Sequence, residues 1–289
     1  MTRRSSPLTW LMPMGTLVQF LLPRWLVMKL APVIGRIFYQ FNPGLRHRLI
    51  DNCRHILGPE TPAQELERTA RRTMVNYVRN YLDLLRIPVL KQRVVRLAQF
   101  DATQLDRILA QNRGAILVTA HLGNWDLAGV FLSALGYPIS AVVEPIPRGW
   151  TKTFNRYRTA LAMEAIPIPD HQAIARALET GRLMALVADR DLTGRGILCP
   201  AFDGRRSFPK GPAAYALRYH LPVVVGYFVF QDQPGRPPYL AVVEPPFPFQ
   251  PTGNNDQDVV AFTQLIAARL NELIARYPDQ WLVLRPDWR

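Results

Sequence analysis

The feature that most constrains the fold is an alternation of short apolar runs with amphipathic segments after Gly114. The apolar runs are short enough to be buried strands, and turn residues or helical spacing separate them. We expect strands at 115–120, 139–143, 166–168, 183–188, 222–230 and 239–245. We expect helices at 103–112, 124–135, 149–163, 171–180, 211–220 and 256–277. This alternation predicts an α/β fold with a central, mixed β-sheet flanked by helices.

The region before this alternation is apolar and basic. Residues 5–23 carry no charge, and Arg24 and Lys29 then follow among aromatic and aliphatic side chains. Cations mixed with Trp, Phe and Leu are typical of a helix that lies in the headgroup region of a bilayer. Prolines interrupt the uncharged run, so a single membrane span is the weaker alternative. We expect residues 1–58 to be a membrane-associating helical segment and 59–289 to form the α/β domain, with a first helix from 59 that ends at Pro88.

The excess of basic residues indicates what kind of partner this protein binds. The chain has 35 Lys and Arg against 22 Asp and Glu, a formal charge of +13, and no acidic residue precedes Asp51. Such an excess favours a polyanionic partner. We expect an anionic membrane surface and no nucleic acid, because the early aromatic residues stand among aliphatic ones. A nucleic-acid-binding protein is the alternative, and it would show steeply salt-dependent binding.

One motif, the hexapeptide His-Leu-Gly-Asn-Trp-Asp at 121–126, carries catalytic chemistry. His121 follows a predicted strand, the chain can turn at Gly123, and Asn124 can cap the next helix. The turn would bring the Asp126 carboxylate back to the imidazole, which would then act as a general base on a hydroxyl. The alternative is a half-buried histidine and an ordinary acidic residue in the first turn of a helix. The chain has no dinucleotide-binding or Walker motif, and its histidines and two cysteines lack metal-ligand spacing, so we expect no metal and no cofactor.

Further charged residues follow the predicted strands. Asp189, Arg190 and Asp191 come directly after 183–188, and Glu144 follows 139–143. Polar groups at the carboxyl ends of strands line the sites of α/β folds. We therefore expect these four residues and Lys210 to contact substrate.

Several segments together resemble a known family. They include the basic apolar N-terminus, Arg46, Arg48 and Asn52, the motif extended to His-Leu-Gly-Asn-Trp-Asp-Leu-Ala-Gly, 187–196, 208–213 and 277–288. The chain resembles the membrane acyltransferases of bacterial glycolipids, which include the lipid A lauroyl/myristoyl acyltransferases and the phosphatidylinositol mannoside acyltransferases. The closing segment 277–288 is more similar to the mannoside branch, since the Trp-x-His-x-Arg ending of the lipid A branch is missing.

The resemblance implies an O-acyltransferase that works at the cytoplasmic face of the inner membrane, as a peripheral or single-span protein. The donor would be an acyl thioester, acyl-CoA or acyl carrier protein, and the acceptor a hydroxyl of a membrane glycolipid. His121 would be the base, Asp126 would orient it, and Asn124 and Arg158 would bind substrate at the site. Two alternatives stay open: a lysophospholipid or glycerol-phosphate acyltransferase, although its Pro-Glu-Gly-Thr-Arg block is missing, and a catalytically inactive membrane-surface protein.

Overall fold

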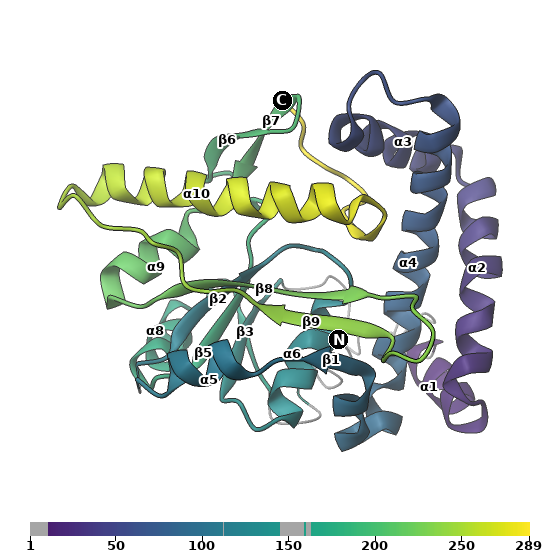
Figure 1. Ribbon diagram of the computed structural model, residues 1–289, viewed down its shortest axis with the longest axis horizontal. Helices are drawn as coiled ribbons and strands as arrows, with labels where there is room; N and C mark the ends of the chain where they lie inside the picture. The colour runs from purple at the N-terminus through teal and green to yellow at the C-terminus, as the bar shows by residue number, and fades with distance from the viewer. Residues whose placement is uncertain (1–10, 112, 145–158, 160–162) are drawn as a thin grey trace, which may run out of the picture.

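The computed structural model describes residues 11–111, 113–144, 159 and 163–289, with side chains from Gly15 onward. A seven-stranded sheet forms its centre, in the order β1-β9-β8-β2-β5-β3-β4 (Figure 1). All pairs in this sheet are parallel except β8 with β9. The predicted α/β fold with a central mixed sheet is therefore confirmed, and the sheet is mostly parallel.

The strands of the sheet are short, and most of them are buried. Their bounds are β1 (Ala98–Phe100), β2 (Ala115–Thr119), β3 (Ile139–Val143), β4 (Glu164–Pro167), β5 (Leu183–Val187), β8 (Val223–Phe230) and β9 (Tyr239–Val243). Every residue of β2 and β8 is buried, as expected for central strands covered on both faces. A separate antiparallel hairpin comprises β6 (Ile197–Ala201) and β7 (Gly204–Phe208).

Helices cover both faces of the sheet. Ile116 and Val118 of β2 pack toward α8 (His171–Glu179), α9 (Gly211–Tyr219) and α10 (Asn255–Arg276). Ala115 and Leu117 point to the opposite face, where α5 (Thr103–Leu109) and α6 (Trp125–Ala134) form a second core. This alternation follows from the two-residue side-chain period of a strand.

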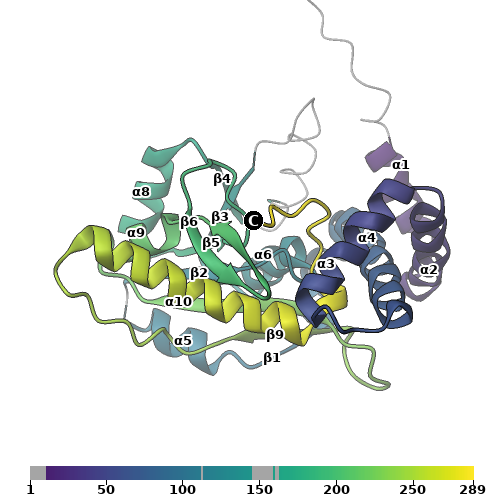
Figure 2. The same ribbon diagram turned by 90° about the horizontal axis from the view of Figure 1, so that it is seen from above.

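The N-terminal helices stand beside the sheet (Figures 1 and 2). They are α1 (Leu11–Leu21), α2 (Arg24–Gln40), α3 (Pro43–Leu57) and α4 (Ala63–Leu90). Helices α2, α3 and α4 share a core of their own. Within the described residues, we find no helix that is both long enough and apolar enough to cross a membrane. The predicted domain boundary at 58/59 stays a prediction.

One expectation about local structure is wrong, and some elements were not expected. Helix α4 does not end at Pro88: the proline lies inside the helix, which continues to Leu90, and Leu90 packs against the same core as Leu84 and Ile87. The 3-10 helix η2 (Lys91–Leu97) follows it. The apolar pattern did not reveal β1 or the β6–β7 hairpin. The hairpin is missed because Arg205, Arg206 and Pro200 break the apolar run. The predicted helix at 149–163 lies almost entirely outside the described residues.

Candidate active site

The candidate site lies where two neighbouring parallel strands end. Strands β2 and β5 pair in register, with Thr119 opposite Val187. His121 comes two residues after Thr119, and Asp189 comes two residues after Val187. The pairing thus brings together two residues that are 68 positions apart in the sequence.

Asp189 holds His121 through two contacts, one to the imidazole and one to the backbone amide. One carboxylate oxygen lies 2.7 Å from His121 Nδ1, and the other accepts a hydrogen bond of 3.1 Å from the His121 backbone amide. A carboxylate only accepts hydrogen bonds, so Nδ1 carries a proton, and in the neutral imidazole Nε2 is then the atom with the free lone pair. The His121 side chain remains 20% exposed. The arrangement is that of a histidine poised to take a proton at Nε2.

The environment of Asp189 keeps its carboxylate ionised although it is fully buried. Burial by itself raises the pKa of Asp189, but the attraction and hydrogen bond of His121, the charge of Arg206 and the Trp281 hydrogen bond bring that pKa well below its usual range. Trp281 Nε1 donates to Asp189 at 2.8 Å, and Arg206 Nη2 donates to its backbone carbonyl at 2.8 Å. Arg206 is fully buried beside the Trp281 ring.

The turn between His121 and α6 is fixed by contacts from several elements. Gly123 has φ +61°, and a Cβ built there would lie 2.1 Å from the Phe228 carbonyl oxygen, so only glycine fits. The Gly123 carbonyl accepts a hydrogen bond of 3.0 Å from Asn80 of α4. Asn124 caps α6 by accepting a hydrogen bond of 3.0 Å from the Leu127 amide, so the predicted turn and cap are confirmed.

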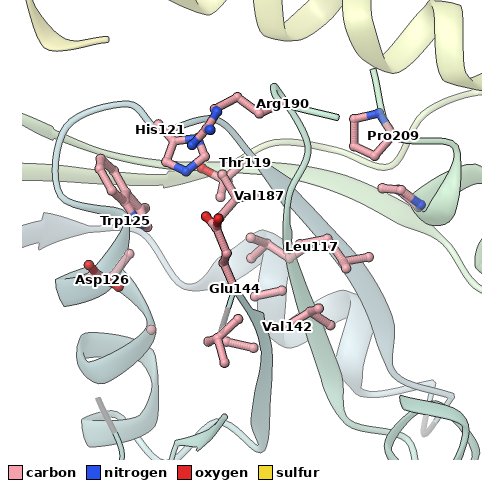
Figure 3. Close-up of a pocket in the computed structure, with 18 of the residues that line it drawn as sticks. Leu117, Thr119, His121, Trp125, Asp126, Val142, Glu144, Val187, Arg190 and Pro209 are labelled. Carbon is pink, nitrogen blue, oxygen red and sulfur yellow. The ribbon is translucent and has the colours of Figure 1, made fainter. Parts of the chain in front are cut away.

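A large cavity of about 1320 Å³ opens beside His121 (Figure 3). Ligand pockets commonly measure about 300–1,000 Å³, so this one has room for a large substrate. Its deep part is apolar and lies between α6 and the sheet, where Leu117, Phe131, Met163, Gly226 and Ala241 line it. The site therefore combines a proton acceptor with an extended apolar chamber.

Four of the predicted site residues besides His121 line this cavity. They are Asp126, Glu144, Arg190 and Lys210. Figure 3 shows Trp125 and Asp126 on α6 to one side of His121, with Arg190 beside the imidazole. The carboxylate at His121 Nδ1 belongs to Asp189, and the expectation that Asp126 orients the imidazole stays a prediction.

Three other predicted site residues, Asn124, Asp189 and Asp191, are not among the residues that line the cavity. Asn124 and Asp189 are fully buried and engaged with protein groups. Asp191 accepts hydrogen bonds from the amides of Thr193, Gly194 and Gly196 and from the Thr193 and Ser207 hydroxyls. Burial raises the pKa of Asp191, but these donors outweigh it and lower that pKa to about 2. Its visible role is to shape the 191–196 loop. Arg158 lies outside the described residues.

The sequence analysis missed Arg206 and Trp281, the buried partners of Asp189, and the cavity-lining cations Arg195 and Arg285. Arg206 belongs to the β6–β7 hairpin, which was not predicted. Trp281 lies in the closing segment, where the sequence pattern predicts no strand or helix that would end at a site. In the sequence, Asp189 was marked only by its position after a short apolar strand, of similar length to the strand before His121. Strand order, which shows that these strands are neighbours, was the missing information.

Comparison with known proteins now defines the class. The family described as bacterial lipid A biosynthesis acyltransferase matches residues 3–289 of this chain. The chain belongs to this family and is an acyltransferase, which implies a lipid acceptor and an acyl donor.

Individual relatives are more specific. The chain is 30% identical over 261 residues to the phosphatidylinositol mannoside acyltransferase of Mycolicibacterium smegmatis, covering 86% of this chain and 82% of that protein. It is 27% identical over 284 residues to the protein of the same name from Mycobacterium tuberculosis, covering 91% of this chain and 86% of that protein. The resemblance inferred from the motifs, including the mannoside branch, is thereby confirmed.

Proposed function

We propose that the protein transfers a fatty acyl group from a thioester to a hydroxyl of a membrane glycolipid of the phosphatidylinositol mannoside or lipid A type. The observation that carries this proposal is the His121–Asp189 pair at the mouth of a large, mostly apolar cavity. Family membership supports the reaction class, and the names of the relatives support a glycolipid acceptor. Catalysis needs no metal or cofactor in this scheme.

In the proposed reaction His121 Nε2 removes the proton of the acceptor hydroxyl while its oxygen attacks the thioester carbonyl. The tetrahedral oxyanion then collapses to the ester, the C–S bond breaks, and the imidazolium returns the proton to the leaving thiolate. Asp189 keeps the imidazole in the reactive tautomer and stabilises the imidazolium. We assign oxyanion stabilisation to the amino-terminal end of α6, which begins at Trp125 and favours negative charge.

The apolar part of the cavity suits the acyl chain. Each methylene that leaves water contributes about 0.8 kcal/mol, so a chamber of limited depth can select for chain length. Glycine and alanine keep the chamber open, at Gly226 and Ala241 on one side and at Gly129 of α6 on another. At Gly129 an added Cβ would lie 2.4 Å from Met163 Sδ, so larger side chains there would reshape the chamber.

The polar mouth of the cavity suits a phosphate-bearing substrate. Arg190, Arg195, Lys210 and Arg285 line it, against the acidic residues Asp126 and Glu144. Across the described part of the chain, none of the four cations has a carboxylate within ion-pair distance. The pairing of Ile197 with Phe208 continues toward Arg195 and Lys210, which places these two cations on adjacent segments. Unneutralised cations beside a reactive histidine favour a phosphate on the donor or on the acceptor.

The surface of α1 and α2 suits an anionic bilayer. Phe20, Leu21, Trp25, Ile37 and Phe38 are each more than half exposed. Lys29 and Arg36 accompany them, and each cation near an anionic leaflet contributes about 1 kcal/mol. We therefore place the protein peripherally on the cytoplasmic face of the inner membrane, with the N-terminal segment as its contact.

The test incubates labelled palmitoyl-CoA with a membrane lipid extract and resolves the products by mass. We expect an acylated glycolipid with the wild type and a loss of about 10²–10⁴-fold with His121→Ala. His47→Ala, which alters an exposed histidine of α3, is the matched control. No product from acyl-CoA or acyl carrier protein, or full activity of His121→Ala, would refute the proposal. If a product forms only with lysophosphatidate, the acceptor is a lysophospholipid and not a glycolipid.

The nature of the donor is tested with three thioesters of the same acyl group. Acyl-pantetheine lacks phosphate, while acyl-CoA and acyl carrier protein both carry it. If the cations bind donor phosphate, Arg195→Gln and Lys210→Gln will raise KM for acyl-CoA and leave kinetics with acyl-pantetheine unchanged. If they bind acceptor phosphate, both donors will be affected equally.

A further inference from the structure

A chain of buried polar groups links the start of α2 to the catalytic turn. Arg24 donates from Nε and Nη2 to both carboxylate oxygens of Asp83, at 2.9 and 2.7 Å. The Tyr239 hydroxyl donates to Asp83, and Asn124 Nδ2 donates to the Tyr239 oxygen at 3.1 Å. Asn124 is the N-cap of α6 and follows His121 by three positions. Four elements of the fold, α2, α4, β9 and α6, thus contribute one member each.

The direction of each hydrogen bond in this chain is determined. The Asp83 carboxylate can only accept, so the Tyr239 hydroxyl must donate to it and present its lone pair to Asn124. The Asn124 amide nitrogen therefore faces Tyr239, and its oxygen faces the Leu127 amide that it caps. The chain consequently orients the cap of α6, whose first turn adjoins His121.

The chain is not explained by stability alone. Asp83, Tyr239 and Asn124 have no solvent exposure, and burying an ion pair often stabilises a protein no more than apolar packing would. Burial and the neighbouring Asp83 charge also raise the pKa of Tyr239 well above its usual value, so the phenol stays a donor at any physiological pH. Such a satisfied network specifies one geometry.

The outer end of the chain lies in the surface that we assign to the bilayer. Arg24 is the first residue of α2, between Leu21, which is 76% exposed, and Trp25, which is 62% exposed. Arg86 of α4 also donates to the backbone oxygens of Gln19 and Leu22, which holds the corner between α1 and α2. Asn80 of the same helix bonds the Gly123 carbonyl. Helix α4 therefore contacts both the bilayer-facing corner and the catalytic turn, and Figure 1 shows it between α2 and the sheet.

We propose that Arg24, Asp83 and Tyr239 are positioning residues that couple the seating of α2 on a membrane to the geometry of the His121 turn. This inference rests on the proposed function for its catalytic readout. When the bilayer holds the α1–α2 corner, Arg24 is fixed against Asp83. Asp83 then fixes the Tyr239 hydroxyl, and the hydroxyl fixes Asn124, the cap of α6. The enzyme would then be most active when it sits on the membrane that contains its acceptor.

The test uses Tyr239→Phe, which removes only the hydroxyl that joins Asp83 to Asn124. Tyr137→Phe is the matched control, because it also removes a tyrosine hydroxyl bonded to a carboxylate, that of Asp106, away from α2. Amide hydrogen exchange over 122–128 is measured with and without vesicles of phosphatidylglycerol and phosphatidylcholine, and kcat and KM are measured on the same vesicles. Arg24→Lys, which keeps the charge but loses the bidentate contact, is the second variant in case Tyr239→Phe does not fold.

We expect vesicles to slow exchange over 122–128 in the wild type and in Tyr137→Phe. In Tyr239→Phe and Arg24→Lys the proteins should still bind vesicles, while the slowing is lost and kcat falls about tenfold with KM unchanged. Equal exchange and kcat in Tyr239→Phe and Tyr137→Phe would overturn the inference. Absence of activity in the wild type would refute the proposed function, while the exchange measurement would still decide the coupling.

Discussion

Replacing Asp189 by asparagine tests the assignment of the His121 partner most directly, because the geometry dictates how the amide must lie. One carboxylate oxygen accepts from both the His121 amide and Trp281 Nε1, at 3.1 and 2.8 Å. Two donors at one position require an oxygen there. The amide nitrogen of the asparagine must therefore occupy the other position, 2.7 Å from His121 Nδ1.

That orientation reverses the tautomer of the imidazole. The asparagine nitrogen donates to Nδ1, so the His121 proton moves to Nε2, the atom that has to accept the substrate proton. The ring keeps its position but loses its function as a base. A wrong tautomer of this kind costs about 10⁴-fold in kcat in the serine-protease case, and we expect a loss of about 10³–10⁴-fold.

The assay compares single-turnover acyl transfer by Asp189→Asn, Asp126→Asn and wild type, with ¹⁵N spectra of the imidazole to report the tautomer. We expect Asp189→Asn to bind donor as the wild type does and to show a protonated Nε2. Wild-type kcat for Asp189→Asn would refute the reasoning. If Asp126→Asn alone carries the large loss and the tautomer change, Asp126 is the orienting carboxylate, as the motif suggested.

Further predictions concern the turn at Gly123, the 191–196 loop and the exposed apolar surface of α1 and α2. Gly123→Ala should destabilise the fold by at least about 1–3 kcal/mol in denaturant titrations and abolish activity, whereas Gly136→Ala, with φ +94° and open space around it, should have only the backbone cost. Because folding lowers the pKa of Asp191, its stabilising contribution is complete above pH about 4 and disappears as the pH falls toward 2; thermal melts of Asp191→Asn should lack this component. Trp25→Ser should reduce vesicle partitioning about tenfold in sedimentation, while Val260→Ser on α10 should leave partitioning unchanged.

The sequence alone was sufficient for the fold class, and it singled out His121 as the candidate general base. Both follow from local information: apolar runs of strand length, helical spacing between them, and a histidine directly after a strand and before a turn at Gly123. The resemblance of the motifs extended this to the family, and the comparisons confirm it. Proline context was less reliable, since α4 continues past Pro88 to Leu90.

What only the tertiary structure decided is that the Asp189 carboxylate lies at His121 Nδ1. Asp126 is five positions from His121, so proximity in the sequence favoured it. Asp189 reaches Nδ1 because β2 and β5 are neighbours in the sheet, and strand order depends on packing across the whole domain. The same reason hides Trp281, Arg206 and the chain from Arg24 to Asn124. Each joins residues far apart in the sequence, and only the folded arrangement of strands and helices brings them within hydrogen-bond distance.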